Sequence, residues 1–308
     1  MLWELFCQPF AEFDFMWQAL LGMFCLALGA APLGVLLQLR RMSLTGDAIS
    51  HAVLPGVAAG YLIAGQNIWA MGAGGLAAGL VMALGVGVAS RKSVVREDAH
   101  LAAFYLTCLA LGVALVSRYG SQADLLHLLF GSVLAMDASA LLLLAVVAGV
   151  TVLALFIARW ALLAQVIDPL FLRARGGHST LWHVVFLMLV VLNLVAGFQA
   201  MGTLMAVGLM MLPAIIARLW VRSIRAMVLL ALLLALVCGY GGLLLSYHAE
   251  LPPGPAIILL CAAAYVFSLV FGAQGARLKR PNLRQTGGQQ PCPGSAPTNG
   301  VRWCAPKR

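Results

Sequence analysis

The sequence predicts an all-α membrane protein with about nine transmembrane helices. Of the 308 residues, 63% are hydrophobic and only 9% are charged, whereas a soluble domain usually carries roughly 25% charged residues. Apolar runs long enough to cross a bilayer, about 20 residues, recur along the chain. These runs are rich in Leu, Ala, Val and Gly and do not break into short alternating strands. They therefore favour helices over a closed barrel, the two structures that satisfy the backbone in lipid.

Nine apolar segments are expected to span the membrane, and eight is the alternative count. The second and seventh are short or interrupted, because Pro55 and Pro213 fall inside them. The nine segments are residues 15–39, 46–64, 68–90, 99–117, 139–158, 182–198, 201–217, 227–245 and 256–273.

The charged residues favour one orientation in the membrane. Lys and Arg follow the odd-numbered segments, whereas the opposite face keeps only Arg118, beside acidic residues such as Asp124 and Glu250. Because Lys and Arg collect on the cytoplasmic side of bacterial membranes, we expect a cytoplasmic C-terminus and an N-terminus outside. The net charge of +9 therefore reflects membrane topology. The expected surroundings are lipid, and no nucleic-acid partner is expected.

Two parts of the chain differ in composition. Residues 1–275 hold all the apolar segments, whereas residues 276–308 are expected to form a disordered, basic cytoplasmic tail. The seven cysteines include no CxxC pair, so no disulfide framework is expected. The chain has no GxxxxGK(S/T) phosphate loop. If the chain takes part in ATP-driven transport, ATP hydrolysis must therefore occur in another chain.

Asp47 and His51, just inside the second segment, form the first candidate site. They are four residues apart, so their side chains share one face of a helix. An ionisable residue in a membrane segment is costly and indicates function, and a carboxylate with an imidazole suits zinc, manganese or iron(II). Two ligands do not close a site, so a symmetry mate, water or other groups must complete it. Alternatively, the pair is structural, an ion pair or a helix cap formed by Thr45 and Asp47.

The second candidate site lies in the longest cytoplasmic loop. An Asp-Pro pair at Asp168 predicts a helix start, and Gly176 predicts a helix stop. The short helix between them would present Phe171, Arg173 and Arg175 to the cytoplasm. It is either a docking surface for a soluble partner or a solvated connector.

Several motifs together resemble the permeases of the zinc, manganese and iron-chelate class of ABC importers. Residues 41–57, RMSLTGDAISHAVLPGV, look very like that family's hallmark. Further matches lie at residues 124–131, 202–214 and 244–255. The motifs occur in the expected order, and the resemblance covers about residues 5–275, so the match is specific.

The resemblance implies a fold similar to the larger vitamin B12 and iron-siderophore permeases. It also implies a homodimer in the bacterial plasma membrane that works with ABC ATPase subunits and an extracytoplasmic metal-binding protein. It assigns Asp47 and His51 to the cation path and the second candidate site to ATPase docking. Zinc, manganese or iron would be transported cargo, and no permanently bound cofactor is expected.

Two alternatives from other functional classes remain at this stage. A stand-alone secondary transporter or channel for metal ions would be favoured by an inverted repeat, and the sequence shows none. A membrane-embedded enzyme with a metal centre would need a fuller set of ligands, such as an HExxH motif, which is absent.

The predicted topology can be tested with reporter fusions. A reporter fused after Arg280 should report the cytoplasm, and one inserted within residues 121–136 should report the outside, because the basic loops face the cytoplasm. Finding both reporters on the same side of the membrane would show that the predicted set of spans is wrong.

Overall fold

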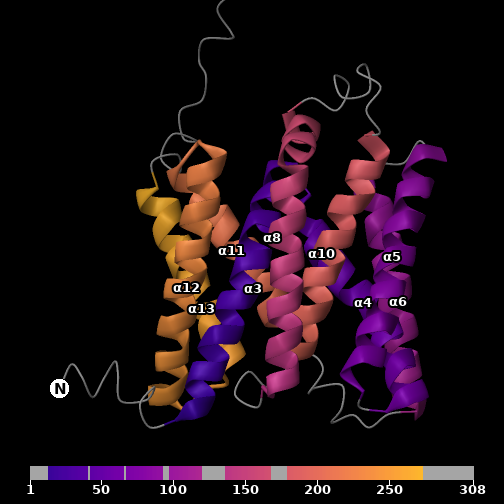
Figure 1. The fold of residues 1–308 in the computed structure, drawn as a ribbon, viewed down its shortest axis with the longest axis horizontal. Coiled ribbons are helices and arrows are strands. Elements are labelled where there is room, and N and C mark those ends of the chain that lie inside the picture. The colour runs from indigo at the N-terminus through magenta and orange to yellow at the C-terminus, as the bar shows by residue number, and fades with distance from the viewer. Residues whose placement is uncertain are drawn as a thin grey trace, which may run out of the picture.

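The computed structural model describes residues 13–40, 42–65, 67–92, 97–119, 136–167 and 179–272. Within these ranges the chain forms nine α-helices and no strand (Figure 1). The helices are α3 (Asp14–Leu39), α4 (Ser43–Ala64), α5 (Ile68–Lys92), α6 (Glu97–Tyr119), α8 (Ala138–Ile167), α10 (Ser179–Met201), α11 (Thr203–Trp220), α12 (Ile224–Ala249) and α13 (Pro253–Phe271). Each coincides with one predicted span, in order, which confirms the all-α, multi-pass fold.

Eight of these helices are long and apolar enough to cross a membrane. The ninth is α6, whose apolar part is the shorter stretch Ala99–Leu115. Pro55 and Pro213 lie inside continuous helices, so the segments that they were expected to interrupt are intact. The second segment, Thr45–Ala64, is nevertheless the least apolar of the eight.

The fifth span was expected at approximately residues 139–158, whereas α8 continues to Ile167 and its candidate span reaches Ala164. The guanidinium carbon of Arg159 lies 4.8 Å from the ring centre of Phe156 and 5.5 Å from that of Trp160. Arginine is a good helix former, so the charge at Arg159 does not interrupt α8.

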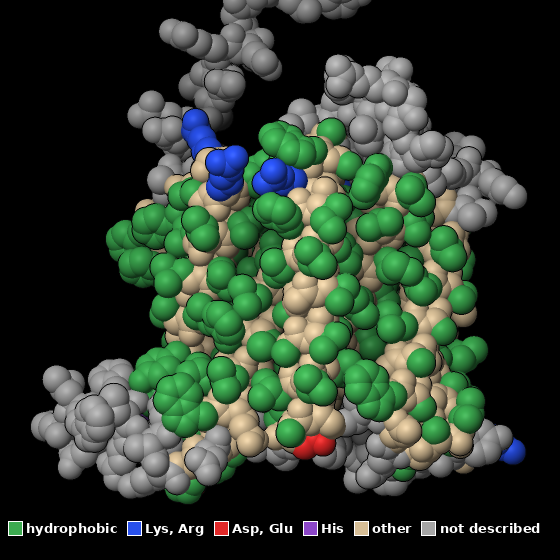
Figure 2. Space-filling model, in the orientation of Figure 1, with side chains coloured by type: hydrophobic (Ala, Val, Ile, Leu, Met, Phe, Trp, Pro, Cys, Tyr) green, Lys and Arg blue, Asp and Glu red, His purple; other side chains and the backbone are tan. Residues whose placement is uncertain are grey.

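Successive helices run in alternating directions, so α3, α5, α8, α11 and α13 all end at the upper end of the bundle in Figure 1. The Lys and Arg side chains visible in Figure 2 gather mainly at this end, and an acidic side chain lies at the opposite end. Between these two ends of the bundle, the helix surfaces form a belt of exposed apolar side chains. The bundle therefore has the one-sided distribution of charge that the sequence predicts.

Two arginines connect the C-terminal end of α3 to α11 and α10. Arg218 of α11 donates from Nη1 to the carbonyl oxygen of Gln38 at 2.7 Å, and this carbonyl is one of those that a helix end leaves without an intrahelical donor. The guanidinium carbon of Arg40 lies 4.1 Å from the ring centre of Phe186 in α10. Burial lowers the pKa of Arg40 to about 10, so the side chain remains charged at neutral pH.

A buried hydrogen bond connects α10 to α8 near the middle of the bundle, and α3 packs closely against the same side chain. Asn193 of α10 donates from Nδ2 to Oγ1 of Thr151 in α8 at 2.6 Å and to the carbonyl oxygen of Leu189 at 2.9 Å. A Cβ added to Gly29 of α3 would collide with the Asn193 amide oxygen. Such interhelical bonds contribute about 0.6 kcal/mol each in membranes, so Asn193 acts mainly by fixing how α3, α8 and α10 are rotated.

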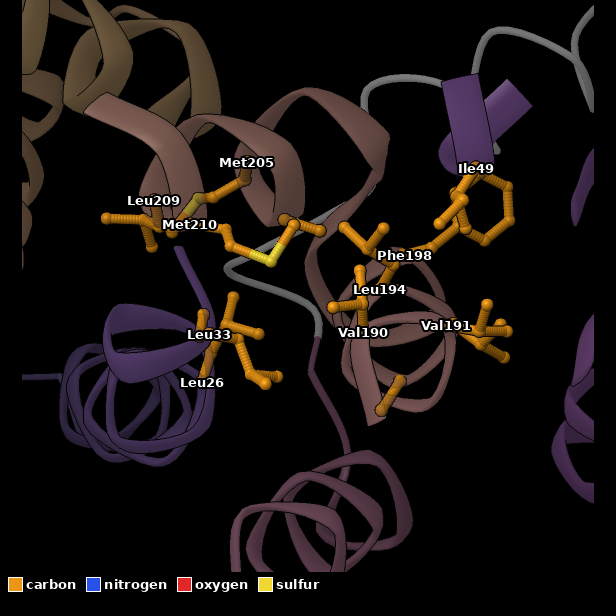
Figure 3. Packing of buried hydrophobic residues seen from close by; sticks show 14 of the residues in the cluster. Leu26, Leu33, Ile49, Val190, Val191, Leu194, Phe198, Met205, Leu209 and Met210 are labelled. Atoms are coloured by element: carbon orange, nitrogen blue, oxygen red, sulfur yellow. The ribbon is translucent and has the colours of Figure 1, made fainter. Parts of the chain in front are cut away.

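Apolar side chains complete the core between α3, α10 and α11. Figure 3 shows Leu26 and Leu33 of α3 facing side chains of α10 and α11, and Ile49 of α4 belongs to the same buried cluster. Ile49 is only 1% exposed. The first half of α4 is therefore packed against this core.

α4 and α5 approach each other through glycine. A Cβ added to Gly56 would collide with the carbonyl oxygen of Gly74, and a Cβ added to Gly74 would collide with that of Gly56. One turn further along α4, a Cβ at Gly60 would lie 2.6 Å from the carbonyl oxygen of Ala70. Small residues let helix backbones approach closely in lipid, so these glycines set the height and rotation of α4.

The close contact at Gly56 predicts that a change from glycine to alanine affects stability differently at two positions. Gly56→Ala should destabilise the protein, because the new methyl group has no space, and overpacking typically costs ~1–3 kcal/mol. Gly87→Ala is the matched control, since Gly87 is also helical and a Cβ there meets nothing within 4 Å. Both changes gain the same helix propensity, about 1 kcal/mol. Thermal unfolding of the purified variants measures the effect, and equal midpoints would contradict the packing described above.

Candidate functional site

The helix that carries Asp47 begins earlier than a capping role for this residue would require. α4 begins at Ser43, its N-cap is Met42, and no side chain caps it. Thr45 and Asp47 therefore both lie inside the helix, and the Thr45 hydroxyl is buried without a hydrogen-bond partner in the described part of the chain. The helix-cap interpretation of these two residues is wrong, because a cap must precede the first turn.

Asp47 and His51 share one face of α4, as their spacing predicts. His51 Nε2 lies 3.6 Å from Asp47 Oδ1, and 60% of the Asp47 side chain is exposed, against 27% of His51. Ser50 donates from Oγ to the Asp47 carbonyl oxygen at 2.7 Å. The carboxylate and the imidazole nitrogen thus point into the same open space beside α4.

The Nδ1 side of the His51 imidazole is buried, and Nδ1 has no hydrogen-bond partner among the described residues. The ring centre lies 6.2 Å from that of Tyr105 in α6. Pro55 has no N–H, so the His51 carbonyl lacks the donor that a regular helix would supply four residues later.

Asp47 lies four residues after the start of α4 and is the third residue of the candidate membrane span Thr45–Ala64. Gly46, directly before Asp47, packs against the side chains of Met210 and Met211 in α11. A carboxylate that faced lipid here would be costly, so we expect water, another chain or a cation on its exposed side.

One chain does not supply a closed metal site in its described part. No group of three or more His, Cys, Asp or Glu side chains there could hold a metal ion. Asp47 and His51 therefore offer one oxygen and one nitrogen ligand, and the remaining ligands must come from elsewhere. Sequence analysis did not find Tyr105 or the two methionines, because they come from other helices and nothing local in the sequence links them to Asp47.

The second candidate site cannot be placed. Asp168, Phe171, Arg173, Arg175 and Gly176 lie outside the described residues, as do residues 124–131 and the tail from residue 273 onward.

Comparison with known proteins gives a match over most of the chain. A family model described as the ABC 3 transport family matches residues 12–272. The manganese import system permease protein ScaB of Streptococcus gordonii is 31% identical over 275 residues, which cover 89% of this chain and 98% of ScaB. The chelated iron transport system membrane protein YfeD of Yersinia pestis is 31% identical over 271 residues, which cover 88% of this chain and 90% of YfeD.

Solved structures with the same fold give a second comparison. A chain of PsaBC from Streptococcus pneumoniae, solved in complex with Fab, superposes with a TM-score of 0.80 and 29% identity, covering 91% of this chain and 99% of that chain. A putative metal-chelate type ABC transporter in an inward-facing conformation superposes with a TM-score of 0.66 over 82% of this chain and 86% of its own. Its 16% identity supports the fold alone.

Proposed function

Because this chain belongs to the ABC 3 transport family, we propose that it is the membrane-spanning permease of an ATP-driven importer for a divalent transition metal ion. The relatives are named for manganese and iron transport, and zinc, manganese and iron are all compatible with the ligands present. The observation that carries the proposal is the Asp47–His51 pair, whose ligand atoms lie together on one exposed face of α4.

The transported ion would bind between two copies of the chain. Asp47 leaves most of its carboxylate uncovered, and one chain offers only two ligands. A second copy related by a two-fold axis would bring two carboxylates and two imidazoles to one ion, with a net charge near zero. Such a site combines the oxygen and nitrogen ligands that suit these metals. Its affinity must be low enough for release, as in any conducting site.

The rest of the assembly follows from the family. An extracytoplasmic metal-binding protein would deliver the ion to the outer face, and ABC ATPase subunits would bind at the cytoplasmic face. The end of the bundle that holds Arg40, Arg218 and Arg222 would face the cytoplasm, by the positive-inside rule. The N-terminus would then lie outside and the C-terminal tail inside the cell. ATP binding and hydrolysis would drive the helices between outward-open and inward-open states.

A secondary transporter or channel is the alternative function, and family membership argues against it. The two differ in their energy source. Transport by a permease with ATPase partners should stop when ATP is withheld, whereas a stand-alone carrier or channel should continue.

Removing the Asp47 charge should abolish transport without unfolding the protein. Asp47→Asn keeps the shape of the side chain and removes the charge that offsets the cation, so uptake should fall nearly to the level of Asp47→Ala. His51→Ala should fail similarly, because it removes the imidazole ligand. Each change relieves a burial cost instead of adding one. Metal uptake per folded permease, measured with radioactive manganese or zinc, tests this.

The control for this experiment is Asp137→Asn. Asp137 accepts hydrogen bonds from Ser139 Oγ at 2.7 Å and from the Ala140 N–H at 2.9 Å at the start of α8. Asn caps helices about as well as Asp, so this variant should transport normally. If Asp47→Asn also transports normally, the metal-site proposal fails. If it is lost through poor expression or low thermal stability, the pair is structural.

ATPase docking should depend on the loop that begins at Asp168. Charge reversal of Arg173 and Arg175, or Phe171→Ala, should weaken association with the ATPase while the permease remains folded in the membrane. Co-purification of the ATPase with tagged permease measures this. Unchanged co-purification in all of these variants would identify the loop as a connector.

A further inference from the structure

Arg159 is an exposed residue on the surface of α8 that faces away from the bundle. Most of the candidate span Ala138–Ala164 is not buried against other helices. The aromatic side chains beside Arg159 are more exposed than buried, Phe156 at 64% and Trp160 at 71%. In a membrane this surface meets lipid, so Arg159 is a positive charge on the lipid-facing side of a spanning helix.

The guanidinium group of Arg159 contacts aromatic rings but no hydrogen-bond acceptor. Its carbon lies 4.8 Å from the ring centre of Phe156 and 5.5 Å from that of Trp160. No hydrogen bond or ion pair joins Arg159 to another residue in the described part of the chain. A guanidinium group has five N–H donors, so the ring contacts leave its capacity for hydrogen bonding unused.

The length of α8 places Arg159 near one surface of the membrane. The helix begins at Ala138, directly after the exposed carboxylate of Asp137, which caps it. Arg159 follows Ala138 by 21 residues, which is about 32 Å at the helical rise of 1.5 Å per residue. This length is close to the hydrocarbon thickness of a bilayer, about 30 Å. With Asp137 at one surface, Arg159 therefore reaches the headgroups of the opposite leaflet, where Trp is also enriched.

We propose that Arg159, together with Phe156 and Trp160, binds the phosphate group of an anionic phospholipid at the basic end of the bundle. The planar guanidinium group can donate two parallel hydrogen bonds to phosphate oxygens, and the two exposed rings offer apolar surface to the acyl chains below. Arg222 and Arg225 are also exposed at this end, and their charge favours an anionic headgroup over a zwitterionic one. The inference does not depend on the proposed transport function.

The alternative is that Arg159 reaches water and attracts anionic lipid only through its charge. General attraction would make the exposed arginines at this end equivalent. A specific site would distinguish Arg159, because aromatic rings contact its guanidinium group, whereas no such contact joins Arg222 to a described residue. Arg222→Gln is therefore the matched control for Arg159→Gln, since both changes remove one exposed charge from the same end of the bundle.

The test is native mass spectrometry of the full-length permease released from nanodiscs with equal amounts of phosphatidylglycerol and phosphatidylcholine. The unmodified chain should retain phosphatidylglycerol preferentially. Arg159→Gln should lower this retention about ten-fold, as expected for the loss of charge-assisted hydrogen bonds, and should not change retention of phosphatidylcholine. Arg222→Gln should lower it clearly less, because only general attraction is lost. Gln is a good helix former, so both variants should unfold at the same temperature as the unmodified chain in phosphatidylcholine alone.

A second variant tests the site even if Arg159→Gln does not fold. Arg159→Lys keeps the charge but not the planar pair of donors, so phosphatidylglycerol retention should fall several-fold. Unchanged retention in Arg159→Lys or in Arg159→Gln would contradict the proposal. Equal losses in Arg159→Gln and Arg222→Gln would also contradict it, because general attraction then explains the binding. Displacement of phosphatidylglycerol by millimolar inorganic phosphate would show a site for free anions and would overturn the assignment to lipid.

Discussion

The close contact between α4 and α5 is the constraint on which the candidate site depends. Lipid is as apolar as the helix surfaces, so helix association in a membrane relies on packing and polar contacts. Gly56 and Gly74 allow the two backbones to touch, and α5 also packs on α10, where a Cβ at Gly75 would lie 3.4 Å from a methyl carbon of Val195. α10 is in turn fixed to α8 by Asn193. This chain of contacts positions Asp47 and His51 relative to the whole bundle.

Given that position, the exposed Asp47 carboxylate makes sense only if something polar occupies the open side. A carboxylate that faced lipid would be unfavourable, and in the proposed dimer a divalent cation would remove this cost by supplying opposite charge.

The sequence predicted the helices well because hydropathy is a local property of each segment. It also predicted that Asp47 and His51 share a face, because the helical repeat determines this alone. It did not predict how far α8 continues past Arg159, because a charged residue marks where an apolar segment stops and not where the helix ends. It could not predict the contact of Met211 with Gly46, which depends on how two distant helices are rotated. The docking loop lies outside the described residues, so its role stays a prediction.

The central claim is that one ion binds between the Asp47–His51 pairs of two chains. The most direct test is the stoichiometry of manganese bound to the purified full-length permease in nanodiscs, measured by equilibrium dialysis with metal analysis. The account predicts one ion for every two chains and loss of that ion in Asp47→Asn. One ion for each chain, or an ion that remains bound in Asp47→Asn, would contradict it.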